Sequence, residues 1–404
     1  MVGMDENLAE LGGGGASSAA LRNALVRAGG SGAGGGTPLT EGMVFLLAPG
    51  LGFHYLVVKR SVGQRLVISG TAAGVGWGGD TIGEVAQRLG LVVTPLEHAV
   101  ELAADNALVE ALDGGHVVVA WTDVAALPHR RFPPGFAQVV PHLLGVLGFD
   151  EANEEFTLDD GCALPVPIDA TRLRLARAEA PGARNRALCL RAAPPGTVDV
   201  TALLRERIRE ATAAHLRAPL GSRGIAGMRA LAAGLAEPAA PRGWLSLFGR
   251  GAGLFHALLA LHRWIAHGDH GPAAGRGLWV AGLAEAATLP AHGGLVPELE
   301  AWRRIADGWT ALAAEALPDT CPRLAEAREV LDAQLARYSR DGIDSMRVLG
   351  ATSSRLAAIE NEMESEFPLR EADTYALLRD LGARVDALAA AELDSSRRLL
   401  TLVD

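Results

Sequence analysis

GGGGASSAALRN, residues 12–23, is the stretch on which the prediction of the fold depends. Four glycines lead into small polar residues and then into apolar residues at helical spacing, which predicts a helix over 17–28 with Ser17 or Ser18 as its N-cap. The first turn of a helix presents backbone N–H groups at the positive end of the helix dipole, and a thiol placed there is activated. The residue at that position is Ala16, which has no nucleophilic atom.

The composition limits the class of protein. The chain has 404 residues, 49% of them hydrophobic, which is enough for two or three domains with large cores. A net charge of -10 argues against a nucleic-acid-binding protein and against a basic membrane-surface protein. The acidic N-terminus is unlike a signal peptide, and no apolar run approaches the roughly 18 residues of a membrane span. We therefore expect a cytoplasmic protein with no nucleic-acid or membrane partner.

Strand and helix patterns alternate in the first half of the chain. A short helix is predicted after residue 40, followed by a glycine turn and a strand that contains Tyr55. Further elements are predicted as strand 91–95, helix 97–115, strand 116–123, a hairpin within 136–161, strand end and helix 164–177, and strand 187–193.

The pattern changes at the proline-rich segment 193–201, which is a candidate domain boundary. Every later segment has helical spacing, as in a packed bundle. The predicted helices are 200–217, 224–236, 252–267, 275–288, 296–316, 321–340, 345–366 and 370–402. The last of these is apolar enough to pack against a partner chain, so a homodimer is a possible assembly.

The predicted hairpin carries the strongest group of chemical residues. His142 begins one strand, and Asp159 and Asp160 end the next. An antiparallel pairing would bring an imidazole and a carboxylate side by side, as in the base and orienting acid of a catalytic triad. The alternative is a histidine at a strand end beside acids that cap a turn.

Other candidate sites have weaker support. Gly74, Gly76 and Gly79 have the GxGxxG spacing of a dinucleotide fingerprint, but no regular βαβ repeat follows them. The histidines in 256–270 are spaced by six, five and three residues rather than four, so no zinc helix is predicted and they are assigned to an ordinary helix face. Three widely separated cysteines without CxxC spacing indicate neither disulfides nor a zinc knuckle, and Cys162 is expected to be a buried apolar residue. No metal or resident cofactor is predicted.

An ordered set of motifs resembles the family of butirosin biosynthesis protein H. LRN at 21–23 resembles the end of its HC-x-x-x-x-LRN opening, and TEGMVFLLAPGLGF at 40–53 is similar to its second motif. Asp123, Leu127 and Pro128 resemble the family's DxxxLP segment. The strand that begins with His142 resembles the family's GHxVVVxGYD strand. The acid that ends the following strand is matched by Asp159.

The resemblance covers roughly 12–340, because segments at 224–232, 248–259 and 301–313 look like the helical half of the family. It implies an α+β fold, with a papain-like acyltransferase-type domain over 1–195 and an all-α helical domain over 196–404. The helical domain would supply a wall of the substrate cleft and a docking surface.

The resemblance also implies an activity in secondary metabolism. A thiol would take an acyl group from a thioester on the phosphopantetheine arm of an acyl or peptidyl carrier protein, and a small-molecule amine would then accept it to form an amide, with cyclisation as one variant. Position 16 would be the nucleophile, His142 the general base and Asp159 the residue that fixes the imidazole tautomer. Backbone N–H groups at the helix start would stabilise the oxyanion. Candidate substrate-binding residues are Asp123, Tyr55 and Arg22, and the candidate carrier-docking arginines are Arg130, Arg131 and those within 200–230.

The sequence departs from the family at the nucleophile. The family's cysteine position is Ala16, and the histidine before it is Gly15. Three explanations stay open: an inactivated variant, a natural degenerate relative, or replacement of the thiol by Ser17 or Ser18. Two further functions follow from these alternatives, namely a non-catalytic assembly subunit and a hydrolase or peptidase-like thioesterase on the same site.

Overall fold

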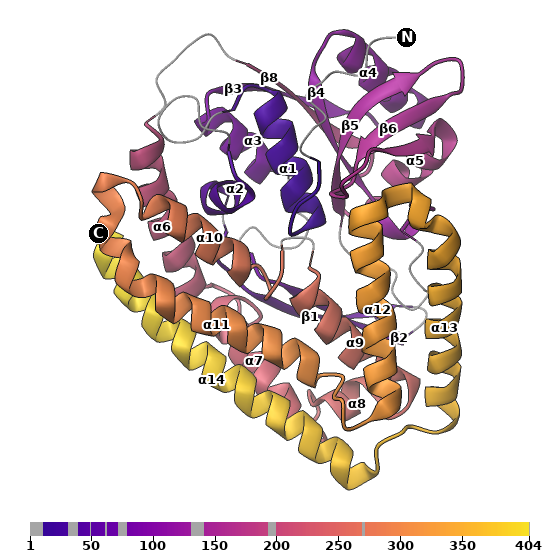
Figure 1. Cartoon of the computed structure of the whole chain (residues 1–404), viewed down its shortest axis with the longest axis vertical. Helices are drawn as coiled ribbons and strands as arrows, with labels where there is room; N and C mark the ends of the chain where they lie inside the picture. Colours follow the sequence, from indigo (N-terminus) through magenta and orange to yellow (C-terminus); the bar gives the residue numbers. More distant parts are fainter. Residues whose placement is uncertain are drawn as a thin grey trace.

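The structure, a computed structural model, describes residues 11–30, 39–48, 50–60, 63–71, 79–130, 141–192, 199–268 and 271–403. A six-stranded sheet with its helices forms the upper part of the molecule in Figure 1, and long helices form the lower part. The α+β fold followed by a helical half is therefore confirmed. No described helix combines the length and apolar character needed to cross a membrane.

The main sheet is antiparallel throughout, in the order β3-β8-β4-β5-β6-β7. Its strands are β3 (Leu91–Glu97), β8 (Arg186–Ala192), β4 (Val117–Thr122), β5 (His142–Asp150), β6 (Glu155–Asp159) and β7 (Val166–Asp169). The hairpin predicted to carry His142 is confirmed as β5 and β6, with Gly145 opposite Asp159.

Both faces of this sheet are covered, which explains the unbroken apolar run of β4. Val119 and Trp121 belong to the core that includes Leu21 of α1, while Val118 and Ala120 belong to a second core with helices α4 and α5. Successive side chains of a strand point to opposite faces, so a strand between two helical layers is apolar at every position. The helices of this part are α1 (Ala16–Arg27), α3 (Gly79–Arg88), α4 (Glu101–Asp113) and α5 (Ala170–Ala178).

Three elements from the first half of the chain lie against the helical half. Helix α2 (Glu41–Leu47) packs on α10 (Arg276–Ala286), where a Cβ on Gly42 would come within 2.7 Å of the backbone nitrogen of Gly282. The separate hairpin of β1 (His54–Arg60) and β2 (Gly63–Ser69) packs on α7 and α9, and the indole of Trp264 donates to the carbonyl of Leu66 at 3.1 Å. One hydrophobic core therefore runs through both halves, although the domain boundary near 195 stays a prediction.

All eight helices predicted beyond residue 200 are present, with ends within two residues of those expected. They are α6 (Val200–Leu216), α7 (Gly224–Ala236), α9 (Ala252–Ala266), α10, α11 (Val296–Glu315), α12 (Pro322–Asp341), α13 (Met346–Ser365) and α14 (Glu371–Val403). A five-residue helix, α8 (Trp244–Phe248), was too short to give a periodic signal.

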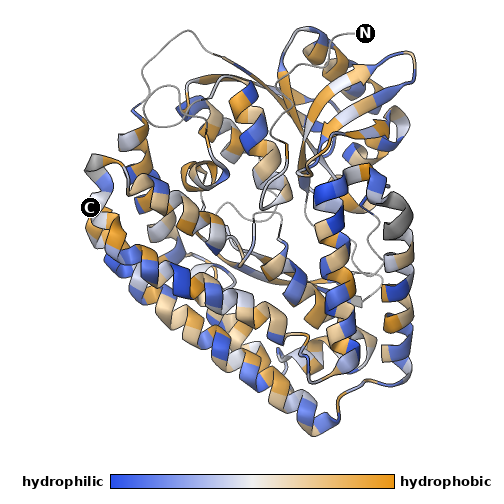
Figure 2. Ribbon diagram, in the orientation of Figure 1, coloured by the Kyte–Doolittle hydropathy of each residue, from blue (hydrophilic) through white to orange (hydrophobic). Residues whose placement is uncertain are grey.

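The apolar face of α14 is used within the chain. Leu378, Leu381, Val385 and Leu388 follow the 3-4-3 spacing of one helical face, and α14 packs on α6, α7 and α11. Figure 2 shows apolar and polar residues alternating along this helix. The apolar face that motivated the homodimer prediction is thus largely covered by the chain's own helices.

A fully buried ion pair fixes the helical half. Arg276 of α10 donates from Nε and Nη2 to the two carboxylate oxygens of Glu392 on α14, at 2.8 and 2.7 Å. The indole of Trp309 on α11 donates to the same carboxylate at 2.6 Å, and Nη1 of Arg276 donates to the carbonyl of Gly70 just after β2. Burial alone would raise the pKa of Glu392, but Arg276 and His215 outweigh it and lower the pKa to about 2.

We expect Glu392→Gln to lower the free energy of unfolding at neutral pH by about 3–5 kcal/mol, because it leaves the buried Arg276 without its counter-charge. Urea denaturation followed by circular dichroism measures this. The exposed pair of Arg304 and Glu300 provides the control, and Glu300→Gln should change stability by no more than about 0.5 kcal/mol.

The same pair predicts a pH dependence. A folded-state pKa of about 2 lies below the ordinary value of about 4.3, so the stabilisation is present above about pH 4.3 and is lost as the pH falls toward 2. Wild type should therefore lose its stability advantage over Glu392→Gln across that window. An advantage that stays constant down to about pH 2 would contradict the assignment.

Candidate functional site

The start of α1 forms one wall of a narrow pocket. Gly15 is the N-cap residue and makes no side-chain capping bond, so the prediction of Ser17 or Ser18 as N-cap was wrong. Ala16 is the first helical residue and lines the pocket together with 13–15. Gly161 lies against it: a Cβ there would come within 2.4 Å of the Cα of Ala16, and its φ of +71° also favours glycine.

The two serines proposed as replacement nucleophiles are buried beside the helix start. Ser17 and Ser18 are fully buried. The Ser17 hydroxyl accepts from the backbone N–H of Leu143 at 3.4 Å, and the Ser18 hydroxyl bonds to the carbonyl of Gly15 and to Glu41. Neither residue lines the pocket, so the geometry does not support the serine alternative.

The carboxylate of Glu41 occupies the N-terminal approach to α1. It accepts from the backbone N–H groups of Gly14 at 2.7 Å and Gly15 at 3.0 Å. N–H groups at the helix start were expected to bind an oxyanion, whereas the N–H groups of Gly14 and Gly15, just before the helix, already bind a carboxylate of the chain.

The LRN motif holds the glycine loop and the end of β6 in place. Arg22 donates from Nη2 to the carbonyl of Gly12 at 2.8 Å. Asn23 donates from Nδ2 to Asp159 at 2.7 Å, and Asp159 also accepts from the backbone N–H of Gly161. Burial raises the pKa of Asp159, and the bond from Asn23 opposes that rise.

The acid that binds His142 is Asp160, not the predicted Asp159. His142 Nε2 lies 2.5 Å from Asp160 Oδ1, and both side chains are fully buried. Asp159 is the last residue of β6 and points toward α1, whereas Asp160 follows the strand and turns toward β5. Because an ionised carboxylate only accepts, Nε2 carries the proton and Nδ1 is the basic nitrogen of the neutral ring.

Asp160 also binds three side chains that the sequence analysis did not assign to it. His129 Nε2 lies 2.8 Å from Oδ2, and Arg130 donates from Nε and Nη2 to the two carboxylate oxygens at 2.7 and 2.6 Å. The hydroxyl of Tyr338, on α12, donates to Oδ2 at 2.7 Å. The helical half therefore completes the surroundings of the acid that binds His142.

The electrostatics follow from this arrangement. Burial alone would raise the pKa of Asp160, but Arg130 and His142 outweigh it and hold that pKa well below its ordinary value. Burial and the negative charge of Asp160 raise the pKa of Tyr338 well above the ordinary value, so its hydroxyl stays a donor. The same two causes raise the pKa of the Cys162 thiol to about 11. The side chain is buried, as predicted.

The pocket has a volume of about 60 Å³, which is room for a few water molecules. Its walls are formed by the start of α1, Arg130, the residues 160–161, the end of α9, and α12. Arg130, Arg263 and His267 line it, and so does the Asp160 carboxylate that pairs with Arg130. His142 lies outside the lining, hydrogen-bonded to Asp160.

The three predicted substrate-binding residues do not meet at this pocket. Asp123 caps a short 3-10 helix by accepting from the N–H of Ala125, and the Tyr55 hydroxyl accepts from the indole of Trp244 at 3.2 Å. Arg22 has the structural role described above. None of the three lines the pocket, and their roles in substrate binding stay predictions. The glycines at 74 and 76 lie outside the described residues, as does Arg131.

Residues 17–161 match the family described as butirosin biosynthesis protein H, N-terminal. This part of the chain is therefore similar to that family. The match indicates a biosynthetic function of the acyltransferase type. It spans His142 and Asp160, and it begins directly after Ala16, the first residue of α1. No curated protein matches the chain.

We expect Tyr338→Phe to lower the free energy of unfolding by about 1.5–3 kcal/mol, because it removes one hydrogen bond to the buried charge of Asp160. Tyr375→Phe on α14, where the ring packs near Arg379, is the matched control and should change stability by less than about 0.5 kcal/mol. Equal denaturation midpoints for the two variants would contradict the role of the Tyr338 hydroxyl.

Proposed function

We propose that the pocket at the start of α1 is an acyl-transfer centre in which residue 16 holds the nucleophile position, His142 is the general base and Asp160 fixes the imidazole tautomer. The observation that carries the proposal is the buried bond between His142 Nε2 and Asp160 Oδ1 beside a helix start. The substrates would be an acyl thioester on a carrier protein and a small-molecule amine.

Ala16 determines which chemistry this chain can perform. No acyl-enzyme can form at a methyl group, so the amine would attack the thioester carbonyl directly. The C–N bond forms as the C–S bond breaks, His142 Nδ1 accepts a proton from the amine, and the leaving thiolate recovers that proton from the imidazolium. The same pair of residues could act on water in place of the amine, which would give hydrolysis.

Restoring the nucleophile tests the proposal. Ala16→Cys, incubated with a panel of acyl thioesters of N-acetylcysteamine, should gain one acyl group by intact mass, whereas Ala16→Cys/His142→Gln should gain it at least about a hundredfold more slowly. Wild type is the background control, because its three cysteines are buried. A folded Ala16→Cys protein that acquires no acyl group would contradict the proposal.

A second candidate function, a non-catalytic subunit, is favoured by Ala16 itself and by the absence of His142 from the pocket lining. Wild type and His142→Gln, given the same thioesters with a primary amine, distinguish the two. Amide formation that depends on His142 supports the enzyme, and its complete absence supports the subunit.

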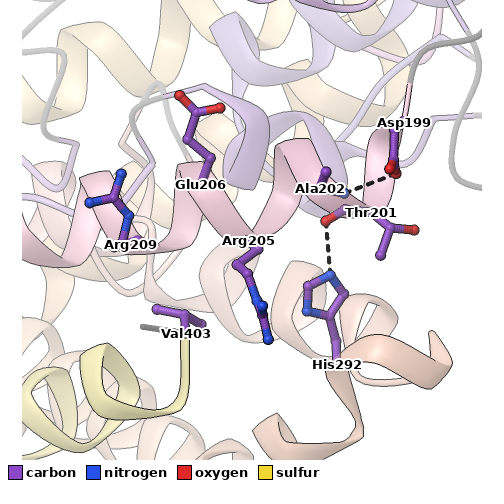
Figure 3. Close-up of a pocket in the computed structure, with 8 residues that line it drawn as sticks. All are labelled: Asp199, Thr201, Ala202, Arg205, Glu206, Arg209, His292 and Val403. Atoms are coloured by element: carbon purple, nitrogen blue, oxygen red, sulfur yellow. Dashed lines mark hydrogen bonds between the residues drawn. The ribbon is translucent and has the colours of Figure 1, made fainter.

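The carrier-docking surface stays a prediction. The positive charge of Arg130 is neutralised by its ion pair with Asp160. Arg205 and Arg209 of α6 line a surface groove of about 650 Å³, but Asp199 and Glu206 line it too (Figure 3). The groove therefore carries mixed charges rather than the basic patch that an acidic carrier protein would favour.

A further inference from the structure

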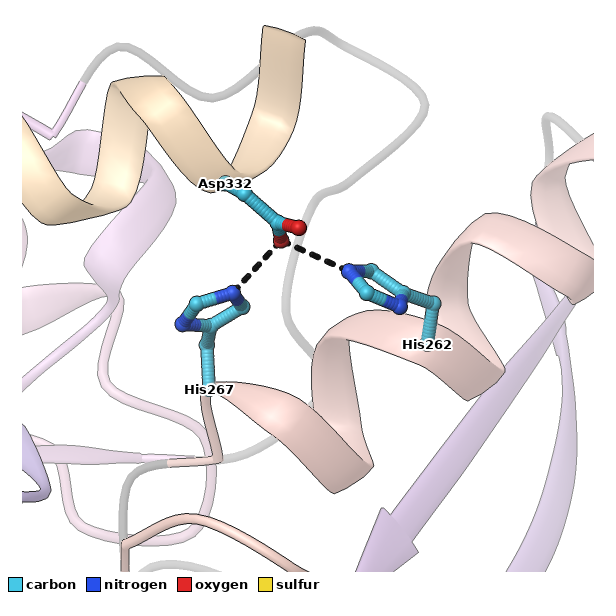
Figure 4. Close-up of side chains that lie close together, drawn as sticks. All are labelled: His262, His267 and Asp332. Atoms are coloured by element: carbon cyan, nitrogen blue, oxygen red, sulfur yellow. Dashed lines mark hydrogen bonds and ion pairs between the residues drawn. The ribbon is translucent and has the colours of Figure 1, made fainter. Parts of the chain in front are cut away.

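Two histidines and an aspartate converge beside the pocket. His262 lies in the last turns of α9, His267 directly follows that helix, and Asp332 lies on α12. Figure 4 shows both rings directed at the same carboxylate oxygen. The Nε2 atoms of His262 and His267 each lie 2.7 Å from Asp332 Oδ1, and the three atoms are within 4.8 Å of one another.

The second nitrogen of His262 fixes its protonation. Nδ1 lies 2.8 Å from the carbonyl oxygen of Ala313, which can only accept, so Nδ1 carries a proton. In a neutral ring, Nε2 then presents a lone pair to Asp332 Oδ1, which is also an acceptor. A second proton on the ring removes this conflict, and so does a metal cation bound between the two atoms. A histidine that donates from its other nitrogen to a backbone carbonyl is the usual arrangement of a metal ligand.

We propose that His262, His267 and Asp332 bind a divalent first-row transition metal ion, with zinc as the reference ion. Two imidazole nitrogens and one carboxylate oxygen are a ligand set of catalytic rather than structural zinc sites, because three protein ligands leave a position for water or substrate. Binding requires the ligand atoms to move apart by about half an ångström, since tetrahedral zinc has ligands at about 2.0–2.1 Å.

The site is exposed enough for an ion to enter and buried enough to hold the ligand side chains in position. The side chains of Asp332 and His267 are 40% and 30% exposed, while that of His262 is only 4% exposed. The nearby cation Arg328, one turn earlier on α12, is engaged by Asp319 and by the carbonyls of Ala314 and Leu317.

The site borders the pocket described above. His267 lines that pocket together with Ala16 and Arg130. The metal-site proposal does not rest on the proposed acyl transfer, because it is argued from His262, His267 and Asp332 alone.

The spacing of these histidines explains why the site was not predicted from the sequence. Five residues separate His262 from His267, which is one more than the spacing of a zinc helix. His267 is the C-cap residue of α9, where the chain leaves the helix and brings the ring back toward His262. The third ligand lies 65 residues further on. The assignment of these two histidines to an ordinary helix face did not anticipate that both rings meet Asp332.

The test uses the whole chain without a histidine tag, made metal-free with a chelator and titrated with Zn²⁺ by calorimetry. One zinc ion should bind per chain. His267→Ala and Asp332→Ala should each weaken this binding at least about tenfold. His256→Ala is the matched control, since this histidine of the same helix bonds to Glu360 instead, and it should bind as wild type does.

Two further measurements keep the result interpretable. Circular dichroism melting shows whether each variant is folded, and Zn²⁺ should raise the melting temperature of wild type but not of Asp332→Ala. Mg²⁺ should do neither, because it prefers oxygen ligands. The proposal is overturned if metal-free wild type does not bind Zn²⁺, or if the folded ligand variants bind it as tightly as wild type. Neither result depends on acyl transfer.

Discussion

The buried carboxylate of Asp160 is the interaction on which the site depends. A fully buried charge is tolerated only when several donors replace its water, and here His129, Arg130, His142 and Tyr338 do so. These donors come from a loop, a strand of the sheet and a helix of the second half. One carboxylate thereby fixes the imidazole and joins the helical half to the sheet at the same point.

The sequence predicted the elements far better than their meeting points. The hairpin, α1 and the later helices follow from apolar spacing that is local, and His142 was found because its strand is strongly patterned. The choice between Asp159 and Asp160 was beyond such reasoning, because adjacent residues at a strand end point in opposite directions. Tyr338 lies 178 residues from Asp160, and no local pattern joins them.

The residues around position 16 are arranged as in a reactive centre, although Ala16 itself has no reactive atom. Gly161 keeps the end of β6 in contact with α1, Asn23 holds Asp159, and Asp160 holds the imidazole, so the geometry does not depend on the side chain at position 16. The opposite wall includes His267, which belongs to the cluster of His262, His267 and Asp332. The lining combines Arg130 and Arg263 with the Asp160 carboxylate, so it suits a polar substrate group.

The central claim is that residue 16 and His142 belong to one reactive centre, and the pH dependence of alkylation at position 16 tests it most directly. In Ala16→Cys, pairing with the imidazolium and the helix dipole should give a thiolate whose labelling by iodoacetamide persists well below pH 7. In Ala16→Cys/His142→Gln the labelling midpoint should return toward about 8.5. An ordinary thiol profile in both proteins would contradict the account.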